Sequence, residues 1–167
     1  MIYAGIGSRE TPLPIIREME NVAMQLAIRG WTLRSGAAKV PIINRPADTD
    51  SADLAFERGC SVIGGKSVIR VATLWQPALD HAAQYHPNWA ACNEHAKALH
   101  ARNSLIMLSD DPINAPVLVN AVVCWTEGGA VKGGTGQALR IAAAYSIPVF
   151  NLATCSVDQF WQWINGR

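Results

Sequence analysis

Short apolar segments alternate along the chain with longer segments in which apolar positions recur every three or four residues. A short apolar run bounded by glycine or polar residues predicts a buried strand, and the three-to-four spacing predicts a helix that packs on one side. Strands are therefore expected at residues 2–6, 31–35, 67–75, 117–125 and 147–152. Strands that alternate with helices predict parallel pairing through crossover helices.

The expected helices begin and end at identifiable signals. Residues 12–30 carry an apolar stripe that follows two prolines, and residues 51–59 have Ser51 as an expected N-cap and Gly59 just past the expected helix end. Residues 104–110 fit either a strand or the last turns of the preceding helix. Further helices are expected at residues 88–100, 134–145 and 157–164. The pattern predicts an α/β domain of three layers with a mostly parallel sheet.

Composition narrows the class of protein. A chain of 167 residues and 18.0 kDa can bury a sizeable core, so residues 1–167 are expected to form a single domain. The formal net charge of +1, without runs of like charge, lacks the basic patch of a general nucleic-acid binder. The cysteines are far apart and form no C-x-x-C motif, so free thiols are expected. Neither an export signal nor a long apolar segment is evident, which favours a cytoplasmic protein without membrane contact.

The loop after the first expected strand carries chemistry suited to a bound ligand. Ligands of parallel sheets bind at the carboxyl ends of the strands, where loops lead into helix N-termini. Gly5 and Gly7 let the backbone approach a ligand, Ser8 offers a hydroxyl group, and Arg9 offers a planar fork suited to phosphate.

Two further loops are expected at the same edge. One follows the second strand and begins at Ser35. The other is rich in glycine, with Gly133 and Gly134 before Thr135 at a helix start, where backbone N–H groups and the helix dipole favour an anion. This loop predicts a cradle for phosphate or ribose. Trp125, at the end of the preceding strand, is a further candidate contact.

Two phosphate-binding motifs are excluded by single residues. The segment GGKS at residues 64–67 resembles the end of a Walker A loop, but Cys60 stands where that motif needs its first glycine. The segment GIGSRE has Glu10 where the dinucleotide fingerprint G-x-G-x-x-G needs its third glycine. Neither a P-loop ATPase nor an ordinary Rossmann dehydrogenase is therefore expected.

The four histidines do not form a recognisable metal motif. His95 and His100 fall on one expected helix but about 140° apart around its axis, and no H-E-x-x-H motif or cysteine pair accompanies them. We expect His81, His86, His95 and His100 to be solvated or capping residues, and no metal site.

Several blocks of the sequence, taken in order, resemble the SLOG superfamily, specifically its DprA-like, Lonely-Guy-related members, which are common in phages and bacteria. The blocks span nearly the whole chain: YAGIGSRETP, GWTLRSG, SADLAFERG, HPNW, LHARNS, VVCWTEGG, GGTGQALRIA and IPVFNLA. The resemblance implies a Rossmann-like fold, homo-oligomers (a dimer or tetramer) and a pocket for a nucleotide or a nucleotide-derived signal. It also favours helix for residues 104–108. The pocket residues that it implies are Gly7, Ser8, Arg9, Ser35, Gly36, Asp53, Arg102, Asn103, Gly134, Thr135 and Gln137.

Two departures from the family pattern bear on function. An insertion from Lys39 to Asp50 separates SGAA from SAD, either as a flap over the pocket or as a surface loop or oligomer contact. Lonely-Guy phosphoribohydrolases resemble this chain at the Gly-Thr pair but have glutamate three residues after the threonine, where this chain has Ala138. A catalytic carboxylate would therefore have to come from Glu10 or Glu127.

The expected function is binding of a nucleotide or nucleotide-derived small molecule, with possible sensing or sequestration of a signal nucleotide. No cofactor is expected. Two alternatives stay open: an N-glycosidic or phosphoribosyl hydrolase of the Lonely-Guy type that uses Glu10 or Glu127, and DprA-like binding of single-stranded DNA, which the low net charge disfavours.

Overall fold

The computed structural model describes residues 1–36 and 51–167 as five parallel strands and their connecting helices. The expected insertion from Lys39 to Asp50 lies outside these residues. The strand order is β3-β2-β1-β4-β5, which is Rossmann-like and all parallel. The strands are β1 (Ile2–Gly5), β2 (Thr32–Gly36), β3 (Ser67–Arg70), β4 (Ala121–Cys124) and β5 (Val149–Asn151).

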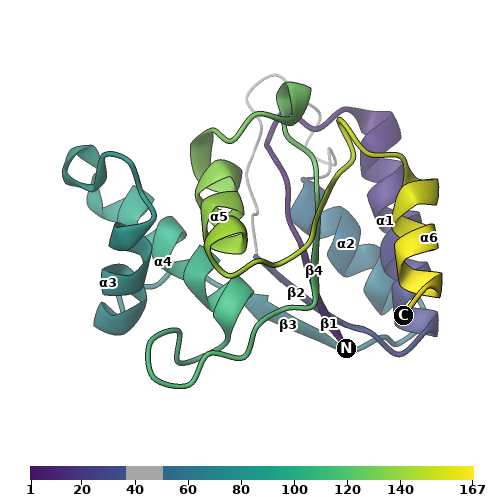
Figure 1. The fold of residues 1–167 in the computed structure, drawn as a ribbon, viewed down its shortest axis with the longest axis horizontal. Coiled ribbons are helices and arrows are strands. Elements are labelled where there is room, and N and C mark those ends of the chain that lie inside the picture. The colour runs from purple at the N-terminus through teal and green to yellow at the C-terminus, as the bar shows by residue number, and fades with distance from the viewer. Residues whose placement is uncertain (37–50) are drawn as a thin grey trace.

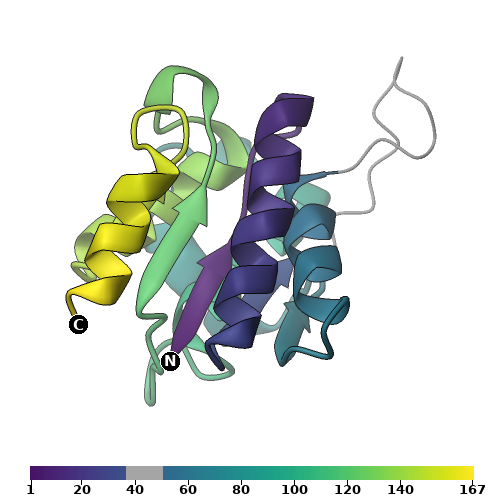
Figure 2. The same ribbon diagram turned by 90° about the vertical axis from the view of Figure 1, so that its right-hand side faces the viewer.

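β1 is the central strand, and its side chains alternate between two helical layers. Tyr3 and, on the adjacent strand β4, Val123 pack against α1, α2 and α6, whereas Ala4 and Val122 pack against α4 and α5. Figures 1 and 2 show these two groups of helices on opposite faces of the sheet. The helices are α1 (Leu13–Ile28), α2 (Ala52–Ser61), α3 (Gln76–Gln84), α4 (Glu94–Leu108), α5 (Gly133–Ala144) and α6 (Val157–Asn165), with short 3-10 turns η1 (Trp89–Ala91) and η2 (Glu127–Gly129). The expected three-layer architecture is confirmed.

α1 and α2 pack closely, and this contact corrects the expected end of α2. Ser51 caps the helix as expected, because its Oγ accepts a hydrogen bond from the Leu54 amide. Gly59, however, lies inside α2 rather than past its end. A Cβ atom at Gly59 would collide with the backbone carbonyl of Glu20 on α1. The glycine therefore permits close helix packing and does not end the helix.

β3 and β4 fall furthest short of their apolar segments, by five residues each. β3 ends at Arg70, whose partner Gly36 is the last residue of β2. Before β4, the amides of Val117 and Val119 donate to the Leu108 and Met107 carbonyls at the end of α4 instead of to a neighbouring strand. Apolar character therefore extends beyond the hydrogen-bonded ladder at both places.

α4 begins later and extends further than the 88–100 segment expected to be helical. Asn93 caps it through a 2.8 Å hydrogen bond from the Ala96 amide, and the helix continues through residues 104–108, which confirms the helical alternative. α3, which sequence reasoning missed, packs on the outer side of α4 through Ala78 and Leu105. Within the described ranges, each helix is too short or too polar to cross a lipid bilayer.

Candidate functional site

A pocket of about 860 Å³ lies where β1 and β4 end. The chain runs outward from β1 to β2 and β3, then returns to β4 on the other side of β1, so the sheet changes direction at this pair of strands. Such a switch point is where open parallel sheets bind ligands. Loops after β1 and β4 line the pocket together with the starts of α2 and α5 and one side of α4.

The loop after β1 is held in place by its own hydrogen bonds. The Ser8 amide donates to the Trp125 carbonyl over 3.1 Å, which joins this loop to the one after β4. The Thr11 hydroxyl donates to the Ser8 carbonyl, and Ser8 Oγ accepts from the Glu10 amide over 3.3 Å. These contacts leave the side chains of Arg9 and Glu10 exposed in the pocket wall.

The first turn of α5 forms the opposite side of the pocket. Its N-cap residue, Lys132, makes no side-chain capping hydrogen bond within the described structure. Gly133 has a φ of +63°, and Gly133, Gly134 and Thr135 line the pocket. The leading N–H groups of a helix have no partner within it, so an uncapped start in a pocket is suited to an anion.

The glycines around this turn serve different purposes. Gly129 and Gly133 have positive φ angles, and a Cβ at Gly136 would lie 2.6 Å from the Val131 carbonyl carbon. Gly134 has neither constraint: its φ is not positive, and no heavy atom of the described residues lies within 4 Å of a Cβ built there. Gly134 is thus the glycine that the local fold does not require.

Asp53 and Arg102 form a largely buried pair at the base of the pocket. Arg102 Nη1 lies 3.9 Å from Asp53 Oδ2, and the two side chains are 13% and 6% exposed. Gly36 makes room for them, since a Cβ there would lie 2.5 Å from the guanidinium carbon of Arg102 and 2.8 Å from Asp53 Oδ2. Arg102 Nε is buried and has no hydrogen-bond partner among the described residues. The guanidinium group therefore keeps unused donor capacity.

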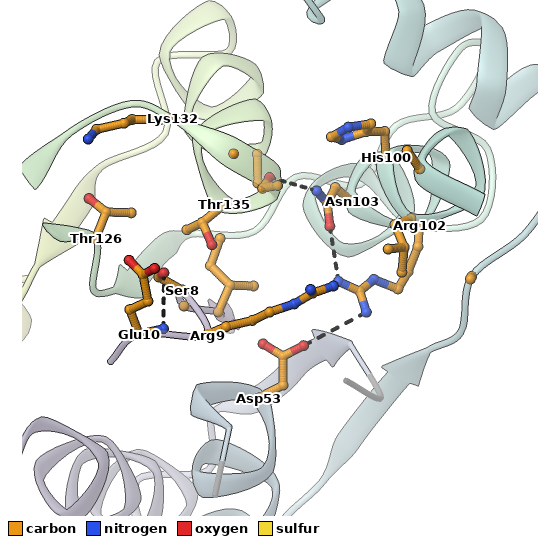
Figure 3. A pocket seen from close by; sticks show the side chains of 18 of the residues that line it. Ser8, Arg9, Glu10, Asp53, His100, Arg102, Asn103, Thr126, Lys132 and Thr135 are labelled. Atoms are coloured by element: carbon orange, nitrogen blue, oxygen red, sulfur yellow. Dashed lines mark hydrogen bonds and ion pairs between the residues drawn. The ribbon is translucent and has the colours of Figure 1, made fainter. Parts of the chain in front are cut away.

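Arg9 and Arg102 point toward each other across the pocket (Figure 3). Two guanidinium groups repel each other, and the Asp53 carboxylate forms an ion pair with Arg102 at the base of the pocket. An anion between them would replace that repulsion with charge-assisted hydrogen bonds. The arrangement is chemically suited to a phosphate or carboxylate group.

Five of the residues expected in the site are absent from the pocket lining: Gly5, Ser35, Gly36, Trp125 and Gln137. Ser35 is buried and donates through Oγ to the Gly5 carbonyl over 2.5 Å, and Gly5 has no room for a side chain because of Phe56. Gln137 is wholly buried and accepts a hydrogen bond from Asn103. Trp125 packs against the core beside α1 and α6. The structure brings together the others: Gly7, Ser8, Arg9, Asp53, Arg102, Asn103, Gly133, Gly134 and Thr135, with Gly36 directly beneath the Asp53–Arg102 pair.

The pocket also contains polar residues that sequence reasoning missed. Thr126 follows β4 and is fixed by Asn151, which donates to its Oγ1 over 2.7 Å. Lys132 precedes the glycines of α5, and His95 and His100 project from α4. The position of Thr126 just after a strand could have identified it. The histidines could not be found this way, because only the tertiary fold turns α4 toward the pocket.

The expectation of solvated or capping histidines is wrong for His81 and His100, which are buried. His81 Nδ1 lies 2.9 Å from Ser104 Oγ and its Nε2 lies 3.2 Å from the Tyr145 hydroxyl, and burial lowers its pKa. Burial, assisted by the neighbouring His86, lowers the pKa of His100 to about 4. The error has a physical cause: α3, which sequence reasoning missed, carries His81 onto α4.

The carboxylates of the pocket are distributed around its wall. Ala138 contributes only a methyl group to the lining, whereas Glu10 and Glu127 both line it. Glu127 Oε2 lies 4.0 Å from Lys132 Nζ in an exposed pair. A carboxylate is therefore present in the pocket, although not on the first turns of α5.

The fold and the pocket define a Rossmann-like α/β domain with a cavity at its switch point. Comparison of the chain with protein-family models, with curated proteins and with solved structures finds no match.

Proposed function

We propose that this protein is a SLOG-type domain that binds an anionic nucleotide or nucleotide-derived small molecule. The observation that carries the proposal is the convergence of Arg9 and Arg102 in the switch-point pocket, opposite the uncapped start of α5. Both features favour negative charge, and they come from separate parts of the chain. A volume of about 860 Å³ lies within the range of small-molecule and cofactor sites.

The other side chains of the pocket suit the neutral part of such a ligand. The Asp53 carboxylate can accept hydrogen bonds from ribose hydroxyls, and the Thr126 and Thr135 hydroxyls can donate or accept. His95 offers a ring face for a base. Sensing or sequestration of a signal nucleotide would use this site without chemical change to the ligand.

Identification of a co-purified ligand tests the proposal. The purified protein is denatured, and the released small molecules are identified by mass spectrometry. We expect a phosphate-bearing nucleotide derivative in stoichiometric amount, or, if the site is vacated during purification, saturable binding from a panel of nucleoside mono- and diphosphates, NAD-derived and cyclic nucleotides. The absence of a nucleotide in the extract, together with no binding across the panel, would contradict the proposal.

A hydrolase of the Lonely-Guy type is the second candidate, because Glu10 and Glu127 both line the pocket. A carboxylate near the anomeric carbon could position water or stabilise positive charge, and such general acid–base help contributes about 10²- to 10⁴-fold to rate. The binding proposal predicts that nucleoside monophosphates are recovered intact after long incubation with stoichiometric protein. Released base that disappears in Glu10→Gln or Glu127→Gln would favour the hydrolase instead.

A further inference from the structure

Two histidines and a cysteine from three separate segments meet beside the pocket. His86 follows the end of α3, Cys92 follows η1, and His100 lies on α4. One ligand atom from each of the three residues lies within 4.8 Å of the other two. The sequence spacing alone did not reveal this cluster, because helix periodicity relates His100 only to His95.

The distances within the cluster are close to those of a metal site. Cys92 Sγ lies 3.7 Å from both ring nitrogens of His86, and the rings of His86 and His100 have centroids 4.5 Å apart. In a tetrahedral zinc site, ligand atoms are roughly 3.3 to 3.8 Å apart. Because no pair of ligand atoms is more than 4.8 Å apart, bringing them into that range requires a shift of at most about 1 to 1.5 Å.

One ring nitrogen of His100 is buried without a hydrogen-bond partner among the described residues. The His100 residue is 7% exposed, and its Nδ1 makes no hydrogen bond within the described residues. A buried imidazole nitrogen without a partner carries a desolvation penalty, and such groups in native proteins usually bind a water or an ion or have a functional role. His100 also lines the nucleotide pocket, so the cluster adjoins that pocket through one residue.

We propose that His86, Cys92 and His100 bind one divalent cation of borderline softness, with Zn²⁺ as the preferred ion. Imidazole and thiolate are ligands for zinc and other late transition metals, whereas Mg²⁺ and Ca²⁺ prefer oxygen. Three protein ligands leave one coordination position for water or another small ligand. Binding releases the thiol proton of Cys92, because the thiolate is the ligand form.

Ion binding changes one existing contact of His86. The Asn88 amide donates to His86 Nδ1 over 3.2 Å, so Nδ1 is unprotonated in the ion-free arrangement. Coordination through Nδ1 displaces that amide, and coordination through Nε2 moves the ring proton to Nδ1. Either route breaks this hydrogen bond. Trp89, whose ring lies 6.0 Å from His86 and 6.2 Å from His100 between centroids, remains as the wall of the site.

Metal loading of the untagged full chain tests the site. Chelator-treated protein is dialysed against Zn²⁺, and the bound metal is measured by elemental mass spectrometry. Co²⁺ is added to a second sample as a spectroscopic probe. We expect one Zn²⁺ per chain, and a thiolate-to-cobalt charge-transfer band with the intense visible absorption of tetrahedral Co²⁺.

Cys92→Ser and His86→Gln should each lower Zn²⁺ affinity by more than the roughly 10- to 100-fold that loss of a second-shell partner costs. Cys92→Ser should also abolish the charge-transfer band. The matched control is Cys155→Ser, which removes another half-buried thiol and should retain both signals. Thermal unfolding of the metal-free proteins confirms that each variant is folded. Zn²⁺ binding that is absent, or equal in the wild type and in both folded ligand variants, would overturn the site.

Discussion

Asn103 on α4 donates through Nδ2 to the Gly134 carbonyl over 3.0 Å and to Gln137 Oε1 over 3.1 Å. Its Oδ1 accepts from Arg102 Nη2 over 3.4 Å. The Asn103 side-chain amide is thus engaged in hydrogen bonds within the protein, which join α4 to the first turn of α5 and orient the Arg102 guanidinium group. Asn103 sets the distance between the two sides of the pocket.

Thr135→Trp should block the pocket and leave the fold intact. Thr135 lines the cavity at the first turn of α5, so an indole there fills the space that an anion would occupy. We expect nucleotide binding to fall below detection in calorimetry, with a nearly unchanged melting temperature. Ala143→Trp, on the exposed side of the same helix, is the control and should bind normally. Normal affinity in Thr135→Trp would place the ligand elsewhere.

Arg9→Ala and Arg102→Ala should each weaken binding of a phosphate-bearing ligand. Loss of a charge-assisted hydrogen bond costs about 1.5 to 3 kcal/mol, which is about 10- to 150-fold in the dissociation constant. Isothermal titration calorimetry measures the change. Arg17→Ala on the exposed side of α1 supplies the matched control. Unchanged affinity in both pocket variants would remove these arginines from the site.

Gly59→Ala and Gly134→Ala should have opposite effects on the free energy of unfolding. The methyl group at residue 59 collides with the Glu20 carbonyl between two helices, so we expect a loss of about 1 to 3 kcal/mol in unfolding free energy. At residue 134 the methyl group meets open space, and alanine favours a helix over glycine by about 1 kcal/mol. Gly134→Ala should therefore keep or raise the free energy of unfolding. It should also weaken ligand binding, because residue 134 lines the pocket and the added methyl group takes up space there. Chemical denaturation and calorimetry of the same samples separate the two effects.

Stability should fall as the pH drops below about 6.5, the ordinary pKa of histidine. Burial lowers the pKa of His81, so the folded protein binds fewer protons there than the unfolded chain does. The stabilisation is complete above the unfolded pKa and is lost as the pH falls below it. His81→Gln should reduce the slope of unfolding free energy against pH. Equal slopes in wild type and His81→Gln would contradict the assignment.

We expect a dimer or tetramer in solution. Val71, Leu74 and Trp75 follow the edge strand β3 and are 67%, 50% and 43% exposed, which leaves apolar side chains beside a strand with one free edge in the described sheet. Light scattering at micromolar concentration should give a multiple of 18.0 kDa. Trp75→Glu should shift the mass toward the monomer if this edge is the contact, and a monomeric wild type would refute the assembly.

The parts of the site that the strand pattern located lie in the loops after β1 and β4 or at the helix start that follows β4, whereas Asp53, Arg102 and Asn103 were implied by the family resemblance. Ser8 and Thr135 are distant in sequence, yet parallel pairing places the ends of β1 and β4 at one edge, so their loops meet. Strand order and glycine position were sufficient for this prediction. The same reasoning placed Trp125 in the site because it follows β4, but its half-buried side chain packs against the core instead. The position of a residue directly after a strand does not determine whether its side chain points into the pocket or toward the core.

The features that sequence reasoning missed depend on contacts between distant elements. Gly59 satisfied the pattern of a helix end, and only the proximity of α1 explains its presence within α2. His81 and His100 are polar residues in segments of mixed character, and their burial follows from α3 packing on α4. Local patterns carry no information on which helix covers which, so these residues could not be assigned without the tertiary structure.

The central position of β1 in the sheet affects how the chain can fold while it is being translated. Ile2 donates its amide to Asn120 Oδ1, a contact across 118 residues, and β1 then pairs with β4. A ribosome that adds about 5 to 20 residues per second needs roughly 6 to 24 s to make the intervening chain. During that interval β1 can pair with β2 but not with β4, so its other edge leaves backbone N–H and C=O groups unpaired beside the apolar side chains of the future core. Nascent chains halted before residue 121 should therefore be bound by chaperones more strongly than chains that include β4.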